Sequence, residues 1–266
     1  MPALFHVDAF AEGPFTGNPA AVCVLTDDFS ASDEWMRAIA GEMNLSETAF
    51  VRPRDDGDWD LRWFTPRVEV DLCGHATLAT AHVLWTEDST DAEILRFHTR
   101  SGVLTATRTD ELVELDFPAL ANTPLDPPDA LAAALGVEPV AAARNVHDLL
   151  VEVVDAAAVR SLVPDLDAVA AIDARAIVVT ARSDDARYDF VSRCFGPRVG
   201  IDEDPATGSA HCALATYWAE RLGRTEFRAY QASARGGTLL VTLEGDRVRL
   251  GGTAVTISRG ELIASS

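Results

Sequence analysis

The segment RWFTPRV, residues Arg62–Val68, returns later in the chain as RCFGPRV, residues Arg193–Val199 (193 − 62 = 131). A second match follows in the same order, because Gly74-His75-Ala76 aligns with Gly208-Ser209-Ala210 (208 − 74 = 134). The second copy therefore carries an insertion of three residues (134 − 131 = 3). Both matched triplets open a stretch of small residues, which predicts the start of a helix in each copy.

A third match extends the repeat, because Gly102-Val103-Leu104 aligns with Gly237-Thr238-Leu239 (237 − 102 = 135). Three ordered matches at a nearly constant separation indicate duplication of one structural unit. Solenoid repeats have periods of roughly 20 to 50 residues, and this period is far longer. We therefore expect two domains, residues 1–118 and 119–253, and the 266 residues are enough for each to bury a core of its own.

In each unit the hydrophobic pattern predicts strands, a central helix and then a hairpin. Both helices are rich in Ala, Leu and aromatic residues on more than one face, which is typical of helices buried inside curled sheets. The proline-containing stretch 119–128 is expected to connect the units, with a short helix between Pro128 and Gly136. The expected strands are 49–52, 59–64, 94–97, 103–107 and 112–117 around a helix at 75–85, and 176–180, 189–195, 238–243 and 247–250 around a helix at 209–222.

The composition excludes several classes of function. The formal net charge of -20 repels phosphate backbones and anionic lipids, so nucleic acid and membranes are not expected as partners. All 22 basic residues are arginine, and the absence of lysine excludes a pyridoxal phosphate Schiff base, lysine aldolases and a P-loop. The longest apolar runs are too short to span a bilayer.

The four cysteines indicate a reducing environment. They show no paired metal spacing and follow no secretory segment, so we expect free thiols, a cytoplasmic location and no metal site. Two of them lie in apolar runs typical of a protein core. The four are Cys23, Cys73, Cys194 and Cys212.

His75 and Ser209 occupy equivalent positions, each just after a glycine and at the start of a predicted helix. The free N–H groups and the positive dipole ends of two such helices would form an anion site. A single exposed helix end contributes only about 0.3–1 kcal/mol, so two ends would hold a carboxylate better than one. The alternative is that Thr207 and Ser209 are ordinary N-cap residues.

Glu47 lies between the turn-like Asn44 and an apolar strand, where the chain enters the predicted sheet. Partial burial there would raise the pKa of its carboxyl group toward neutrality and suit it to take up and return a proton. A solvated surface Glu is the alternative. His75 could equally be a core histidine bonded to a backbone carbonyl, and Asp204 could cap the turn that Pro205 starts.

Four segments of the chain resemble one known family. They are Phe15–Ala20 (FTGNPA), Asn44–Thr48 (NLSET), Leu72–Thr77 (LCGHAT) and Glu203–Ala210 (EDPATGSA). In this order and spacing they look like the signature segments of the PhzF-like isomerases of phenazine biosynthesis, and the resemblance covers essentially the whole chain. It is specific for the family and much less so for a substrate or pathway.

The resemblance implies an α+β, diaminopimelate-epimerase-like fold. Each half would wrap a barrel-like sheet around a central helix, strand 254–266 would return to the first domain, and the active site would lie in the cleft between the domains. It implies a cofactor-independent, biosynthetic isomerase that acts as a homodimer on a small unsaturated carboxylic acid. Glu47 would be the general acid/base, and His75, Asp204 and Ser209 would bind and orient the substrate. The further substrate-binding residues would be Gly74, Thr207, Gly208 and Cys73, with Gly74 and Gly208 presenting backbone N–H groups.

Cys73 could be a catalytic base, because related racemases use two opposed thiols, one from each half. On the 131-residue separation its counterpart is Asp204, and Cys212 lies inside the second helix, so only one thiol is available. Cys73 is therefore expected to be a packed residue and not a base. Two alternatives stay open: a racemase or epimerase that uses Cys73, and a non-catalytic protein of the same fold that binds carboxylates.

Overall fold

The computed structural model describes residues 1–26, 29–87 and 90–264. The chain divides into unit 1, which is Met1–Asp116 together with Gly251–Ser266, and unit 2, which is Phe117–Leu250. The sequence placed the boundaries after residues 118 and 253, two and three residues further along the chain (118 − 116 = 2; 253 − 250 = 3). Among the described residues, no helix combines the length and the apolar character needed to cross a membrane.

Unit 1 is built on a mixed sheet whose strands are β1 (Ala3–Ala9), β2 (Asn18–Val24), β3 (Thr48–Pro53), β4 (Trp59–Phe64), β5 (Glu69–Val70), β6 (Ile94–Thr99), β7 (Gly102–Thr109), β8 (Leu112–Pro118) and β18 (Ala254–Glu261). β18, β1 and β2 pair antiparallel, and β2 then runs parallel to β3. β3 pairs antiparallel with β4, which is antiparallel to β5 and parallel to β6. β6, β7 and β8 complete the sheet as an antiparallel meander.

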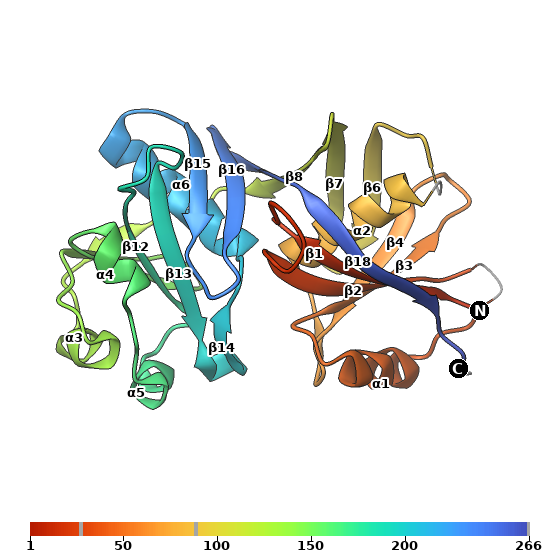
Figure 1. The fold of residues 1–266 in the computed structure, drawn as a ribbon, viewed down its shortest axis with the longest axis horizontal. Helices are drawn as coiled ribbons and strands as arrows, with labels where there is room; N and C mark the ends of the chain where they lie inside the picture. The colour runs from red at the N-terminus through yellow and green to blue at the C-terminus, as the bar shows by residue number, and fades with distance from the viewer. Residues whose placement is uncertain (27–28, 88–89, 265–266) are drawn as a thin grey trace. The chain divides into compact units, whose positions relative to one another are not determined.

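Two helices pack on this sheet. α2 (Gly74–Thr86) contacts β1, β2, β3 and β18 and buries ten of its thirteen residues, as its apolar character on several faces predicts (Figure 1). α1 (Asp33–Met43) begins at the N-cap Ser32, whose side chain accepts a hydrogen bond from the Trp35 N–H. Its buried face, with Trp35 and Met36, packs on Phe50 and Phe64 of the sheet.

Unit 2 repeats this pairing scheme with the strands β9 (Thr123–Leu125), β10 (Ala141–Arg144), β11 (Leu149–Glu152), β12 (Ile177–Arg182), β13 (Phe190–Gly196), β14 (Ile201–Asp204), β15 (Glu226–Gln231), β16 (Gly237–Glu244) and β17 (Arg247–Gly252). β9, β10 and β11 pair antiparallel, β11 is parallel to β12, and β12 pairs antiparallel with β13. β13 is antiparallel to β14 and parallel to β15, which pairs with β16. The order of parallel and antiparallel partners is that of unit 1, so the duplication extends to topology.

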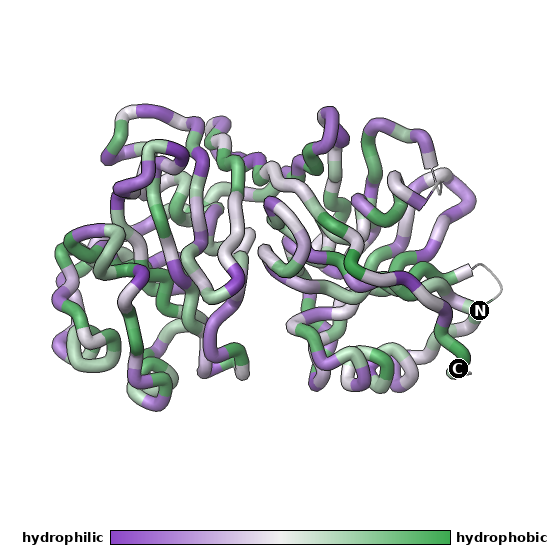
Figure 2. Tube along the Cα trace, in the orientation of Figure 1, coloured by the Kyte–Doolittle hydropathy of each residue, from purple (hydrophilic) through white to green (hydrophobic). Residues whose placement is uncertain are grey.

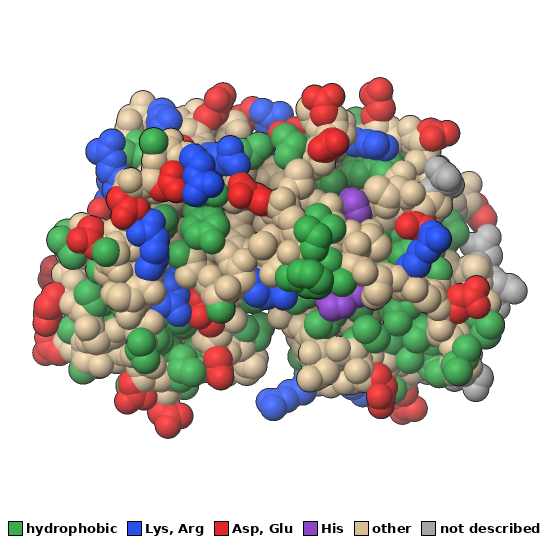
Figure 3. All heavy atoms as spheres, viewed as in Figure 1, with side chains coloured by type: hydrophobic (Ala, Val, Ile, Leu, Met, Phe, Trp, Pro, Cys, Tyr) green, Lys and Arg blue, Asp and Glu red, His purple; other side chains and the backbone are tan. Residues whose placement is uncertain are grey.

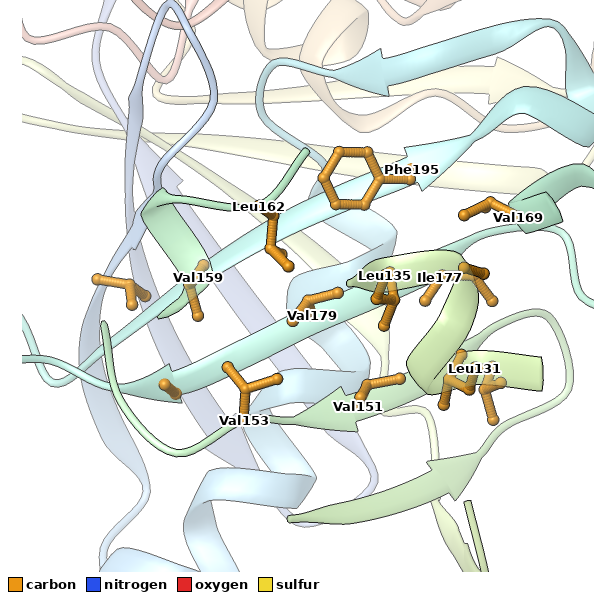
Figure 4. Packing of buried hydrophobic residues seen from close by; sticks show 14 of the residues in the cluster. Leu131, Leu135, Val151, Val153, Val159, Leu162, Val169, Ile177, Val179 and Phe195 are labelled. Atoms are coloured by element: carbon orange, nitrogen blue, oxygen red, sulfur yellow. The ribbon is translucent and has the colours of Figure 1, made fainter. Parts of the chain in front are cut away.

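The central helix of unit 2, α6 (Gly208–Leu222), occupies the same place in the strand order as α2. It ends at Gly223, which adopts a left-handed conformation with φ of 65°. α3 (Asp129–Leu135), α4 (Ala156–Arg160) and α5 (Leu166–Ala171) add a separate apolar layer, in which Leu131 and Leu135 pack with Val151 and Val179 of the sheet (Figure 4). Hydrophobic stretches lie within strands of both units (Figure 2).

The stretch 119–128, which was expected to connect the units, also contains the short strand β9, which includes Pro124. Pro124 lacks a backbone N–H and is tolerated because β9 pairs, among the described residues, with β10 alone. The short helix between Pro128 and Gly136 is present as α3, and these two residues are its caps.

Arginine and acidic side chains are interspersed on the faces of both units that Figure 3 shows, in keeping with the acidic composition. Many of these arginines form ion pairs on the outside of their own unit, such as Arg160 with Asp184. Exposed pairs of this kind contribute only about 0–1 kcal/mol each to stability.

Candidate active site

The first candidate site lies at the N-terminus of α2 in unit 1. His75 is the second residue of the helix and is 5% exposed. Its Nε2 lies 3.3 Å from Glu47 Oε2, and its Nδ1 lies 3.2 Å from Asn18 Nδ2. Cys73 Sγ is 3.6 Å from Nδ1 and 4.0 Å from Nε2 of the same ring. The structure thus brings three of the sequence-predicted residues together, because Glu47 and Cys73 both contact the imidazole of His75.

His75 is a neutral hydrogen-bond donor in this arrangement. Burial lowers its pKa from 6.5 to about 4, so the ring carries no charge near neutral pH. The Asn18 amide N–H donates to Nδ1, which leaves the ring proton on Nε2, facing the Glu47 carboxylate. A core histidine bonded to a backbone carbonyl was the alternative, and the partners found here are side chains.

Glu47 is held by the parallel pairing of β2 and β3. It directly precedes β3, and its backbone carbonyl accepts a hydrogen bond of 3.4 Å from the Ala21 N–H of β2. The residue is only 9% exposed, so the carboxyl group is not a freely solvated surface acid. This hydrogen bond and the adjoining strand fix the backbone of Glu47, whose carboxylate lies next to the ring of His75.

Cys73 is the N-cap residue of α2, and it makes no side-chain capping hydrogen bond. Its backbone carbonyl accepts a hydrogen bond from the Thr77 hydroxyl within the first turn. Gly74 occupies the first helical position, and the first N–H groups of an α-helix have no partner within the helix.

The second candidate site lies at the N-terminus of α6 in unit 2. Thr207 is the N-cap residue, but its hydroxyl donates to Asp204 Oδ2 at 2.5 Å and does not cap the helix. Gln231 is fully buried and fixes this turn: its Oε1 accepts from the Thr207 N–H, and its Nε2 donates to the Asp204 carbonyl and to Thr207 Oγ1. Thr207 and Ser209 are therefore not ordinary side-chain caps.

Ser209 has a charged neighbour that the sequence did not indicate. Arg175 Nη2 donates to Ser209 Oγ at 2.9 Å, and Arg175 Nε and Nη2 donate to the two carboxylate oxygens of Asp148 at 2.8 and 2.6 Å. The Asp148 side chain is 0% exposed, whereas that of Arg175 is 38% exposed. Among the described residues the Nη1 of Arg175 has no partner, so this edge of the guanidinium is available to an anion.

Comparison with known proteins identifies the family. The model of the phenazine biosynthesis-like protein family matches residues 7–260. An uncharacterized isomerase of Halalkalibacterium halodurans is 51% identical to the chain, over 98% of the chain and 98% of the relative. A crystal structure of a phenazine biosynthesis protein of the PhzF family from Enterococcus faecalis has a TM-score of 0.94 at 43% identity and covers 99% of both chains.

The chain belongs to the phenazine biosynthesis-like family. The fold extends further, since a hydroxyproline epimerase from Agrobacterium vitis has a TM-score of 0.64 at 11% identity, over 97% of this chain and 91% of that one. The expected diaminopimelate-epimerase-like fold, mixed α and β with a curled sheet, is confirmed.

In this phenazine biosynthesis-like protein, strand pairing before the two central helices corrects one part of the alignment between the two units. β4 pairs Trp63 with Val70, and β13 pairs its equivalent, Cys194, with Asp204. Asp204 therefore corresponds to Val70 and not to Cys73, which corresponds to Thr207 (207 − 73 = 134). The three extra residues lie between Val199, where the matched segment ends, and Asp204. Because the N-cap of α6 is a threonine, the expected absence of a second thiol there still holds.

Of the remaining cysteines, Cys194 lies next to the start of α6, where it pairs with Asp204 and its thiol is hydrogen-bonded to Thr207. Cys23 and Cys194 are buried in strands, where burial raises the pKa of the Cys23 thiol to about 12. Cys212 is buried within α6. All four cysteines are free thiols. Asn18, Arg175 and Gln231 are the site residues that sequence reasoning missed, although Asn18 stands inside one of the segments that carry the family resemblance.

Proposed function

We propose that this protein is a cofactor-independent isomerase that shifts a proton on a small unsaturated carboxylic acid, with Glu47 as the general acid/base. The observation that carries the proposal is the contact of 3.3 Å between Glu47 Oε2 and the neutral His75 at the start of α2. Two relatives that are 51% identical to the chain are named uncharacterized isomerases, which supports the reaction class.

In the proposed reaction the Glu47 carboxylate removes a proton from the carbon next to the substrate's carboxyl group and returns it to another carbon of the conjugated system. The Nε2–H of His75 orients the carboxylate and stays on the ring, because the low pKa of this histidine opposes its protonation. A positioned acid/base contributes roughly 10²–10⁴ in rate. The N–H groups that follow Cys73 would stabilise negative charge that develops on the substrate.

Unit 2 supplies the residues proposed to bind and orient the substrate. Asp204 and Ser209 were expected in this role from the family resemblance, with Thr207 and Gly208 beside them. Arg175 joins this set, since its free edge lies next to Ser209 and suits a carboxylate. That these residues and Glu47 act on the same substrate molecule stays a prediction, as do the cytoplasmic location and the homodimer.

The test is hydrogen exchange with solvent. The protein is incubated in heavy water with a panel of small unsaturated and amino-substituted cyclic acids, and deuterium incorporation is followed by NMR. Glu47→Gln should abolish incorporation while binding of the same acid, measured by calorimetry, is retained. Glu42→Gln, at an exposed position of α1, is the matched control and should exchange like the wild type. Unchanged exchange in Glu47→Gln would refute the proposed role.

A racemase or epimerase that uses Cys73 is the second candidate function. It is favoured by the position of the thiol, 3.6 Å from His75 Nδ1 on the N-cap of α2. This reaction requires Cys73, whereas the proton shift at Glu47 does not. Full activity of Cys73→Ala on the acid that exchanges would exclude the racemase, and loss of exchange in Cys73→Ala but not in Glu47→Gln would favour it.

A further inference from the structure

The side chains of Glu47, Cys73 and His75 include one atom each that lies within 4.8 Å of the other two. These atoms are a carboxylate oxygen, a thiol sulfur and an imidazole nitrogen. Sulfur and nitrogen donors select Zn²⁺ over Mg²⁺ and Ca²⁺, which prefer sets of oxygen ligands. All three residues are less than a tenth exposed. The group is thus a compact, largely desolvated set of donors of the kind that binds zinc.

We propose that Glu47, Cys73 and His75 form a zinc-binding site with one open coordination position. In tetrahedral zinc sites, bond lengths of about 2.0–2.3 Å place the nitrogen and oxygen ligands about 3.3 Å apart and the nitrogen and sulfur ligands about 3.5 Å apart. Here Nε2 of His75 lies 3.3 Å from Glu47 Oε2 and 4.0 Å from Cys73 Sγ. The first distance already has the required value, and the second needs the thiol to move by roughly 0.5 Å.

Asn18 supplies the outer-shell contact that such a site needs. A zinc-bound histidine almost always donates its other ring N–H to an oxygen. The Asn18 amide lies 3.2 Å from Nδ1, and a half-turn of the amide about its last bond presents its oxygen in place of its nitrogen. His75 could then bind zinc through Nε2 while Nδ1–H donates to Asn18. The same amide therefore serves both the metal-free and the metal-bound ring.

A second group of potential metal ligands in the described part of the chain is less suited to bind a cation. Asp56, Asp58 and His98 also approach one another, but Arg54 donates to both oxygens of Asp56 and all three residues are at least partly exposed. A guanidinium so close to the ligands repels a cation, and this group contains no thiol. Zinc should therefore select the group at the start of α2.

Binding of zinc would occupy the carboxylate that the proposed function uses. Glu47 cannot take a proton from carbon while its oxygen is bound to the metal, so micromolar zinc would act as a reversible inhibitor of the isomerase. This consequence rests on the proposed function, whereas the metal site does not. The Cys73 thiol loses its proton to solvent when it binds the metal and regains one when the metal leaves, so chelator should restore full exchange of substrate hydrogen.

The test uses Co²⁺ as a coloured substitute for zinc, with the whole chain and no substrate. Addition of Co²⁺ to chelator-treated protein should produce the near-ultraviolet charge-transfer band of a thiolate bound to cobalt, and Zn²⁺ should displace it at one equivalent. Cys73→Ser should lose the band, and Cys212→Ser is its matched control and should keep it. His75→Gln should lower the affinity for Zn²⁺ by more than about 100-fold, because loss of a direct ligand should exceed the roughly 10–100-fold effect of losing an outer-shell partner. His98→Gln should leave the affinity unchanged.

Asn18→Ala should weaken Zn²⁺ binding by roughly 10–100-fold without loss of the charge-transfer band at saturation. The proposal is overturned if the wild type gives no such band, or if the band persists in Cys73→Ser. Should Cys73→Ser fail to fold, Glu47→Gln provides the second variant, and unchanged zinc affinity there would also overturn the site. Deuterium exchange in the presence of chelator tests the isomerase separately, so either result can fail without the other.

Discussion

The ion pair between Arg175 and Asp148 is expected to be the most sensitive element of the candidate site in unit 2. Asp148 is 0% exposed, and both its oxygens accept hydrogen bonds from Arg175. Arg175→Met removes these donors and leaves a buried carboxylate without a partner. Breaking a buried ion pair from one side costs about 3–5 kcal/mol, and we expect about 3 kcal/mol because the Arg175 side chain is 38% exposed.

The measurement is the free energy of opening of unit 2, taken from hydrogen exchange of the slowest amides in α6 and β12. A double variant, Arg175→Met with Asp148→Leu, is the decisive control. It removes both charges and fills the space with apolar atoms, so its stability should lie within about 1 kcal/mol of the wild type. The single variants should therefore couple by at least about 2 kcal/mol in a double-mutant cycle.

The same pair should influence ligand binding, since Arg175 also donates to Ser209. In the double variant the fold is restored but the cation is absent, so affinity for a carboxylate should fall while that for the matching amide is unchanged. Coupling below about 0.5 kcal/mol would refute the energetic reasoning. Equal loss for the acid and its amide would refute the role of Arg175 in binding charge.

Three further changes test other parts of the molecule. Burial lowers the pKa of both His75 and His211 to about 4. Below pH 6.5 the unfolded chain therefore binds more protons than the folded one, and the free energy of unfolding should fall by a few kcal/mol from pH 6.5 to pH 4. A urea midpoint that is independent of pH in this range would contradict this expectation. Gly17→Ala places a Cβ 2.2 Å from a backbone oxygen at a φ of 69° and should cost at least about 2 kcal/mol, whereas Gly13→Ala, which has open space, should cost less than about 0.5 kcal/mol in the same urea titration. Gln231→Met leaves buried polar groups of the turn before α6 without partners and should lower the free energy of unfolding by about 1–3 kcal/mol. It should also raise KM more than it lowers kcat. Unchanged steady-state kinetics would show that the turn is not needed for substrate binding.

The sequence predicted the parts of the fold that have a strong pattern. The two central helices, the hairpins and the duplication were predicted because apolar periodicity and the matched glycines lie within short stretches. α4 and α5 were not predicted, since they have only five and six residues. α1 was missed although its one apolar face and the N-cap Ser32 are signals that could have found it. β5 and β14, of two and four residues, have no pattern of their own and exist because β4 and β13 provide a pairing edge.

Glu47, Cys73 and His75 could be named from the segments that carry the family resemblance, and the structure brings their side chains together. Their role in the reaction stays a prediction. Asn18 was not singled out, because its contact with His75 arises from the position of β2 beside α2, which no local pattern encodes. Arg175 was missed for a similar reason: Asp148 and Arg175 meet only because β11 runs parallel to β12.

The two central helices differ at equivalent positions in a way that bears on mechanism. His75 and Ser209 are each the second residue of their helix. Each contacts a charged residue that lies one or two positions before the second strand of a parallel pair, β3 in unit 1 and β12 in unit 2. In unit 1 that residue is the acid Glu47, and in unit 2 it is the cation Arg175. A racemase that works symmetrically needs a base from each copy, but a guanidinium is a poor base because it stays protonated. Divergence of the charged neighbours after duplication therefore favours one copy as the proton-transfer site and the other as the anion-binding site.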